Sequence, residues 1–262
     1  MRLSIDVLLD YGFYAPADLL LAIEVAMLPD QKLIENRLTT WGTAALVPIA
    51  GEDGIGRRTW SQGEFGIRAQ YTATVELDRP LVALAPLAAE PLGMIPAGVI
   101  SYLFASRYCD VESFSPWVRR RFGDLTGGTQ VLAMADWIRR EIAYVPGASD
   151  ARTTAADTFL RREGVCRDYA HLLIAMARAA GIPARMVGCY APGVAPPDFH
   201  AVVEVWLAGG WHLVDPSGLA DPATIVRIGV GRDAIDISFL TVFGTAFFNE
   251  QRVTVVEAAA GG

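Results

Sequence analysis

Three side chains far apart in the sequence have the residue types of a thiol-dependent catalytic site, and the first of them is Cys166. This cysteine follows Gly164 and Val165 and begins a long apolar stretch, residues 166–180. Unpaired N–H groups give a helix N-terminus partial positive charge, which stabilises a thiolate, and the thiolate is the nucleophilic form of cysteine. Cys166 is therefore a candidate nucleophile, although a small buried residue is the commoner interpretation of an isolated cysteine.

A cysteine nucleophile needs a base, and the chain has three histidines. His171 lies five residues after Cys166 on the same predicted helix. A rotation of about 100° per residue turns it to a different face, so we expect His171 in the core or in a supporting role. His200 opens a strand after a loop and can face a cleft from the strand edge. His212 begins the partner strand and is the weaker candidate. Alternate residues of a strand face opposite sides of the sheet, and His212 falls on the side opposite to His200.

The base should in turn be oriented by a third group, and Asp215 lies on the partner strand just before a proline. For Asp215 alone, turn chemistry at a strand end is the simpler interpretation. In an antiparallel pair, the residue numbers of any two opposed residues add up to the same value. The length of the connecting loop therefore decides whether Asp215 lies close enough to His200 to orient it. If the loop is 207–210, Trp206 faces Trp211, and Asp215 becomes a diagonal neighbour on the same face as His200, within roughly 7–8 Å.

A tighter turn made only of Gly209 and Gly210 would instead put His200 opposite Leu219, with Asp215 two pairs away. A catalytic triad of Cys166, His200 and Asp215 therefore predicts a loop of at least four residues, or a bulge.

Composition limits the classes of protein that this chain can belong to. The chain has 262 residues, of which 52% are hydrophobic and 19% are charged, enough for a packed core. A net charge of -7 argues against nucleic acid or an anionic membrane surface as a partner. Three widely spaced cysteines, Cys109, Cys166 and Cys189, argue against a disulfide framework, and we expect the first and last to be buried thiols.

Neither a signal peptide nor a membrane span is expected. The first 15 residues lack a basic start followed by an apolar core, and prolines and Glu90 interrupt the apolar region 81–106. These features predict a cytoplasmic protein. The cysteines and histidines lack the close paired spacing of a zinc site, so we expect neither a metal ion nor a cofactor.

The elements that must position the three side chains form two regions. Residues 1–100 show period-two patterning in "RLSIDVLL" and "EFGIRAQYTATVEL", which predicts an antiparallel β-layer that ends in a proline-rich connector. Residues 101–262 begin with helical segments, including 129–144 after a Thr129 cap and a short helix capped by Thr153 or Thr154.

The apolar helix 166–180 stops at Gly181 and is hydrophobic on nearly every face, which places it at the centre of a domain. Strands at 184–192, 199–207 and 211–216 follow it, and "TIVRIGVG" and "RVTVVE" predict two more. This order indicates an α+β fold, with a central helix packed on an antiparallel sheet.

Three segments, "GVCRDYAHLLIAMARAAGIPAR", "DFHAVVEVWL" and "WHLVDPSG", resemble the signature blocks of the bacterial transglutaminase-like superfamily. "YLFASRYCD" and "VGRDAIDISFLTVFG" are also similar to that family, and the resemblance is specific from Tyr102 to Gly244. It implies a papain-like core with catalytic roles for Cys166, His200 and Asp215. One departure is Val202, where the family pattern has a tryptophan after "HA".

The resemblance implies acyl transfer from an amide, of peptide or glutamine type, through a covalent thioester on Cys166. We expect hydrolysis, as in a cysteine protease or amidase, rather than transfer to an amine, because water is the default acceptor. A peptide, a protein or a small amide would be the substrate. Two alternatives stay open: a non-catalytic peptide-binding module on the same fold, and an amine acyltransferase with a thioester donor. The oligomeric state is also open.

Overall fold

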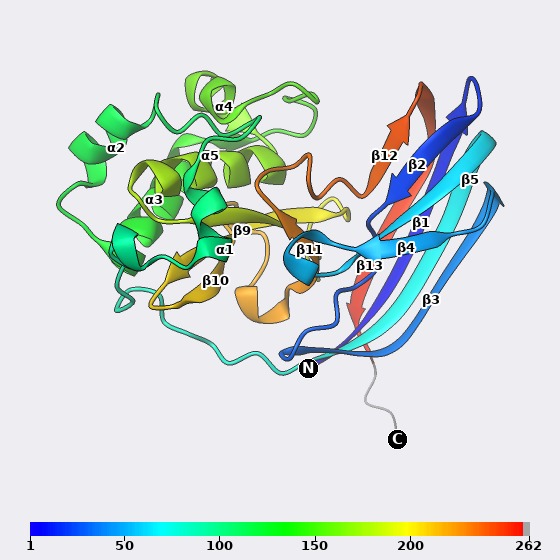
Figure 1. Cartoon of the computed structure of the whole chain (residues 1–262), viewed down its shortest axis with the longest axis horizontal. Helices are drawn as coiled ribbons and strands as arrows, with labels where there is room; N and C mark the ends of the chain where they lie inside the picture. Colours follow the sequence, from blue (N-terminus) through cyan, green and yellow to red (C-terminus); the bar gives the residue numbers. More distant parts are fainter. Residues whose placement is uncertain (259–262) are drawn as a thin grey trace.

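The first layer of the molecule is a seven-stranded antiparallel sheet. The structure is a computed structural model that describes residues 1–258. Figure 1 shows this sheet on one side of the molecule and the helices on the other. Its strands are β1 (Arg2–Phe13), β2 (Ala17–Leu21), β3 (Gln31–Thr43), β4 (Val47–Ala50), β5 (Arg57–Leu77), β12 (Leu240–Phe243) and β13 (Ala246–Glu257).

The long strand β5 organises this layer. Residues 57–63 of β5 pair with β2 and β4, and the remainder pairs mainly with β1 and β3. Alternate side chains of β1, such as Leu3, Ile5 and Val7, are almost fully buried. The period-two pattern of the sequence therefore reports one buried face, as expected for a sheet that covers another layer.

The second layer is a four-stranded antiparallel sheet in the order β10-β9-β8-β11. Its strands are β8 (Ala184–Tyr190), β9 (His200–Leu207), β10 (Gly210–Val214) and β11 (Val226–Gly231). The helices pack beside it: α1 (Ala97–Ile100), α2 (Ser115–Phe122), α3 (Gly127–Glu141), α4 (Ala155–Arg161) and α5 (Cys166–Ala179). A two-stranded parallel pair, β6 (Ala143–Tyr144) and β7 (Glu163–Gly164), precedes α5. Short 3-10 turns lie at η1 (Glu52–Gly54), η2 (Leu92–Met94), η3 (Ser101–Leu103) and η4 (Pro222–Thr224).

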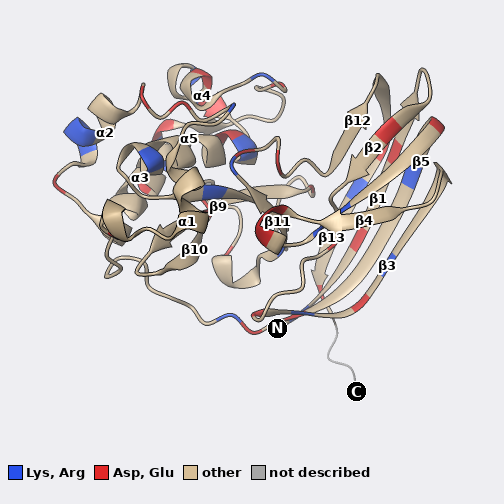
Figure 2. Ribbon diagram, viewed as in Figure 1, with Lys and Arg blue, Asp and Glu red and all other residues tan. Residues whose placement is uncertain are grey.

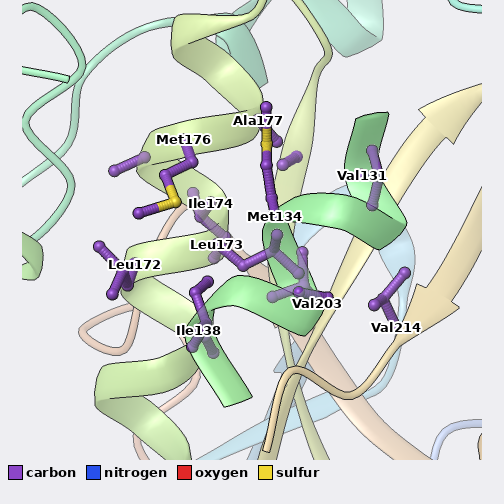
Figure 3. Packing of buried hydrophobic residues seen from close by; sticks show 14 of the residues in the cluster. Val131, Met134, Ile138, Leu172, Leu173, Ile174, Met176, Ala177, Val203 and Val214 are labelled. Carbon is purple, nitrogen blue, oxygen red and sulfur yellow. The ribbon is translucent and has the colours of Figure 1, made fainter. Parts of the chain in front are cut away.

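Helix α5 is the centre of the main hydrophobic core, as its sequence predicts. Its residues Leu172, Leu173 and Ile174 are fully buried, and Figure 3 shows them among side chains from α3 and the strands, such as Met134 and Val203. Each such side chain contributes about 1.5–3 kcal/mol by leaving water. The helix ends where Gly181 adopts a φ of 78°, and its N–H donates to Arg178.

Most of the predicted helix boundaries agree with the structure, and one is wrong. Thr154 caps α4 through a reciprocal pair of hydrogen bonds with Asp157. Helix α3, however, begins at Gly127 rather than after a Thr129 cap. Gly128 donates its N–H to Leu87 at 2.8 Å, and a Cβ on Gly128 would lie 1.7 Å from the Leu84 carbonyl oxygen. The connector therefore runs directly against this helix start, which only glycine permits.

The two layers join through an apolar face and a chain of ion pairs. Tyr190, Val226 and Ile228 of the second sheet pack in the same hydrophobic cluster as the inner face of the first sheet. Alternating arginines and carboxylates cross the same boundary, where Figure 2 shows the acidic η1 turn beside β11. In order they are Arg79, Asp30, Arg227, Glu204, Arg185 and Asp53.

The C-terminal strands return to the first layer. Strand β13 pairs with β1, for example Ile5 with Val255, and β12 pairs with β2, for example Leu21 with Leu240. The division of the chain into domains 1–100 and 101–262 stays a prediction. The pairing of β12 and β13 shows that residues 240–257 contribute to the sheet formed by the first segment. Within residues 1–258, no helix has both the length and the apolar character needed to cross a bilayer.

Candidate active site

Cys166 is the first residue of α5, and its side chain is partly exposed. Cys109 and Cys189 are fully buried, as predicted for structural thiols. The preceding residue, Val165, is extended and forms the helix N-cap, and its N–H donates to Asp168 Oδ2 at 2.8 Å. A reachable thiol therefore stands at the positive end of a buried helix, with a fully buried carboxylate one turn behind it.

Gly164 is needed for the packing of this helix start. A Cβ on Gly164 would lie 2.8 Å from Asp168 Cβ and 3.1 Å from its Oδ2. The absence of a side chain makes room for the capping carboxylate rather than for a ligand. Arg167 then binds the other oxygen of Asp168 at 3.3 Å and donates to the Ser149 hydroxyl and the Asp150 carbonyl, which ties the loop before α4 to the same helix start.

His200 and Asp215 form a buried pair. His200 Nε2 lies 2.9 Å from Asp215 Oδ2, and the two residues are 2% and 5% exposed. Asp215 also accepts hydrogen bonds from the N–H and hydroxyl of Ser217 and from the N–H of Ala220. Four hydrogen bonds therefore fix the carboxylate in one orientation toward the imidazole. They also help explain why the pKa of Asp215 is lowered: burial alone would raise it, but the bonds to His200 and Ser217 outweigh that effect.

The hairpin has the register that this pair requires. Trp206 pairs with Trp211, so His200 projects from the same face as Asp215, just beyond the last ladder pair. The predicted loop of four residues is wrong, because Leu207 and Gly210 also pair. Only Ala208 and Gly209 form the turn, with φ values of 49° and 77°. Two successive positive φ values are typical of a type I′ turn, which matches the twist of the strands.

Cys166 and His200 line the same cavity. Burial by itself would lower the pKa of His200, but the hydrogen bond to Asp215 and the nearby Cys166 thiol, together with the charges of both groups, raise it to about 9. His200 Nδ1 is buried and has no regular hydrogen-bond partner within residues 1–258, which leaves this nitrogen for the sulfur. The raised pKa means that the imidazolium form is favoured at neutral pH.

Tyr144 is a site residue that the sequence reasoning missed. Strand β6 pairs with β7 so that Tyr144 lies opposite Gly164, two residues before the cysteine, and its ring packs 5.8 Å from that of Tyr169. Tyr144 also lies close enough to Cys166 for the two groups to influence each other electrostatically. Burial, reinforced by the charge of a Cys166 thiolate, raises the pKa of Tyr144 to about 12, so the phenol keeps its proton.

The other histidines lie elsewhere. His171 is 1% exposed, accepts a hydrogen bond from the Ala234 N–H at 3.2 Å and stacks on Tyr108. Burial holds its pKa well below the usual range, so His171 is neutral and has the supporting role that was predicted. His212 lies 3.1 Å from the Leu207 carbonyl across the hairpin. Val202, where the family pattern has a tryptophan, is buried in a separate apolar cluster with Val187.

A cavity of about 520 Å³ opens beside the thiol. Cys166 and His200 line it together with apolar residues of the segment 234–242, and Ala22 of the first layer also contributes to its wall. Phe199 and Phe239 stack in parallel at 4.4 Å on this wall. The cavity volume is in the range of small-molecule and peptide sites.

Comparison with known proteins finds a family match in the core. Residues 118–216 match the model of the transglutaminase-like superfamily. A crystal structure from Cytophaga hutchinsonii, described as a candidate cysteine protease, is 29% identical, with a TM-score of 0.91 over 100% of this chain and 92% of that one. The mixed α+β fold, an antiparallel β-layer attached to a transglutaminase-like core, is therefore confirmed over the whole length.

Curated relatives cover less of the chain. An uncharacterised protein of Mycobacterium leprae is 29% identical over 116 residues, which are 41% of this chain and 42% of that protein. A protein-glutamine gamma-glutamyltransferase of Pseudomonas aeruginosa is 37% identical over 91 residues, 30% of this chain and 14% of that protein. The chain thus spans about two fifths of the length of the first curated relatives that it matches.

Proposed function

We propose that this chain is a thiol-dependent acyl-transfer enzyme that acts on amides, with Cys166 as nucleophile, His200 as acid and base, and Asp215 as the group that orients the imidazole. The observation that carries the proposal is the buried pair of His200 Nε2 and Asp215 Oδ2, whose other ring nitrogen is left for a sulfur at a helix N-terminus. Each member has a chemical role only in the presence of the other two.

In the first half of the reaction, the Cys166 thiolate adds to the carbonyl carbon of the amide. The S–C bond forms as the carbonyl π electrons move to oxygen, and the tetrahedral intermediate then expels the amine as His200 donates its Nδ1 proton to the leaving nitrogen. The product is a thioester on Cys166 with neutral His200. Asp215 holds the imidazole and stabilises the imidazolium form before this step.

The oxyanion of the intermediate needs hydrogen-bond donors, and two groups at the helix start can supply them. One is the backbone N–H of Cys166, which helix geometry leaves without an intrahelical acceptor. The other is the hydroxyl of Tyr144, which lies near Cys166 and keeps its proton. Preorganised donors at such a position account for a large part of the rate enhancement in acyl transfer.

In the second half, His200 removes a proton from the acceptor, the acceptor adds to the thioester, and the C–S bond breaks to regenerate the thiolate. Water as acceptor gives hydrolysis, and an amine gives transamidation. We favour hydrolysis, because the partly exposed thiol is open to water and an amine would need a binding site of its own. Substrates would be peptides, proteins or small amides that fit the cavity beside Cys166.

The test combines labelling of the thiol with a search for turnover. Iodoacetamide should alkylate Cys166 at pH values well below the usual pKa of a free thiol, and His200→Ala should abolish this low-pH reaction. Cys166→Ala is the control for labelling, since Cys109 and Cys189 are fully buried. A library of blocked peptides and amides should then be cleaved by the wild type and not by Cys166→Ala, with and without an added primary amine to separate the two acceptors.

A peptide-binding module without turnover is the alternative. It predicts that Cys166 reacts no faster than a model thiol and that Cys166→Ala retains ligands from the same library. That pair of results would refute the proposed enzyme.

A further inference from the structure

The cavity beside Cys166 carries an excess of positive charge although the chain as a whole has a net charge of -7. Two arginines, Arg107 and Arg167, line it, and among residues 1–258 no aspartate or glutamate does. The remaining walls are mainly apolar, including Phe199 and Phe239. A site of this kind favours a ligand that has an apolar part and a negative charge.

Arg107 is an exposed side chain at the edge of this cavity. Its guanidinium lies over the ring of Tyr108 at 5.2 Å, and within residues 1–258 it pairs with no carboxylate. Tyr108 is itself fixed from three sides: its ring stacks on His171 at 4.9 Å, its hydroxyl donates to Ala151, and its N–H donates to Asp233. The cation is therefore supported by a rigid platform, which lowers the entropic cost of binding an anion.

The carboxylates near this platform are occupied by other partners. Asp233 is 1% exposed and accepts the N–H groups of Tyr108 and Ile235, and Asp236 binds Arg232 at 3.1 Å. Asp168 caps α5 and pairs with Arg167. Arg107 can therefore bind an anionic ligand without giving up a carboxylate partner. Arg167, which also lines the cavity, already pairs with Asp168.

We propose that the cavity selects amide substrates that bear a carboxylate close to the attacked carbonyl, and that Arg107 is the residue that binds this carboxylate. The inference rests on the proposed acyl-transfer function, because it concerns the substrate of the same site. Charge-assisted hydrogen bonds from a guanidinium are strong and directional, so a short acidic peptide would be oriented as well as held. The apolar wall would take the neighbouring side chain of such a peptide.

Two alkylating reagents of nearly equal size test this inference without a known substrate. Iodoacetate and iodoacetamide both displace iodide at the Cys166 sulfur, but only iodoacetate carries a carboxylate. At one pH, the rate constant for iodoacetate divided by that for iodoacetamide should be about 3- to 10-fold higher for the wild type than for Arg107→Gln, the range expected for one exposed ion pair with good geometry. The imidazolium of His200 also attracts iodoacetate, and comparing variants at constant pH cancels that contribution.

Arg121→Gln is the matched control, since this exposed arginine on α2 lies outside the cavity and its loss changes the net charge equally. The control should keep the wild-type ratio. If Arg107→Gln also keeps it while iodoacetamide still reacts rapidly and depends on His200, the carboxylate inference is overturned and the proposed enzyme stands. If Cys166 reacts with iodoacetamide only as fast as a model thiol, the proposed function fails, whatever the ratio.

Discussion

Replacing Asp215 with asparagine should change the titration of His200 in a way that can be measured in two assays. Asp215 is the strongest of the groups that raise the pKa of His200 from 6.5 to about 9. Asparagine is nearly isosteric, but it carries no charge, and its amide group cannot accept all the hydrogen bonds that Ser217 and Ala220 donate. We therefore expect the substitution to remove at least half of the rise in the pKa of His200 from 6.5 to about 9.

The magnitude follows from linkage between proton binding and folding. A rise from 6.5 to about 9 in a 2% exposed histidine corresponds to about 3 kcal/mol of differential stability, an upper bound because of residual solvent screening. Because the folded pKa is raised, this stability is fully present below pH 6.5 and is lost as the pH rises through about 9. The variant should lose about 1.5 kcal/mol or more of this pH-dependent part, since the pair with Asp215 supplies much of the shift.

Urea denaturation at pH 6 and pH 10 gives the change in the free energy of unfolding between the two pH values, once for the wild type and once for Asp215→Asn. The difference between these two changes isolates the contribution of this pair. The pH profile of iodoacetamide labelling is the second readout. Its dependence on protonated His200 should move to lower pH in the variant. Equal changes in the two proteins, with unchanged labelling profiles, would refute the assigned coupling between Asp215 and His200.

Three further substitutions test other parts of the structure. Tyr144→Phe should lower kcat by about 100-fold with little change in iodoacetamide labelling, because an oxyanion donor acts on the intermediate and not on the free thiol; faster turnover would show that the phenol blocks the site. Gly164→Ala should destabilise the fold by about 1–3 kcal/mol in urea titrations, because its Cβ would overlap Asp168; unchanged stability would contradict that contact. Glu204→Gln should cost about 3 kcal/mol or more in thermal or urea unfolding, because it removes the buried carboxylate that buried Arg185 shares with partly buried Arg227; a neutral result would show that the charge chain adds nothing to stability.

Much of the candidate site could be predicted because its signals are local. Cys166 follows a glycine and starts an apolar helix, and that pattern is visible within a few residues. The pairing of His200 with Asp215 follows from strand parity once the hairpin register is fixed. The two-residue turn could not be predicted, because Ala208 adopts a positive φ that is rare for alanine.

Other features depend on contacts between distant segments and left no periodic signal. Tyr144 reaches the site through a parallel pair of only two residues on each strand, which is too short for a pattern. Strand β13 joins the first layer across more than 200 residues of sequence, and neither its composition nor its spacing indicates which sheet it extends. Arg107 is recognisable only after Tyr108, His171 and Asp233 have been brought together by the fold.

The contribution of Ala22 and residues 238–242 to the wall beside Cys166 has a practical consequence for anyone who excises the family segment. A fragment limited to residues 118–216 would retain the sulfur, the imidazole and the carboxylate. It would lack the wall of the cavity that Ala22 and residues 238–242 form opposite the substrate. Such a fragment could keep a reactive thiol and still discriminate poorly among amides. Under the proposed function, the reactive groups and the wall that would select a substrate come from segments that lie far apart in the sequence.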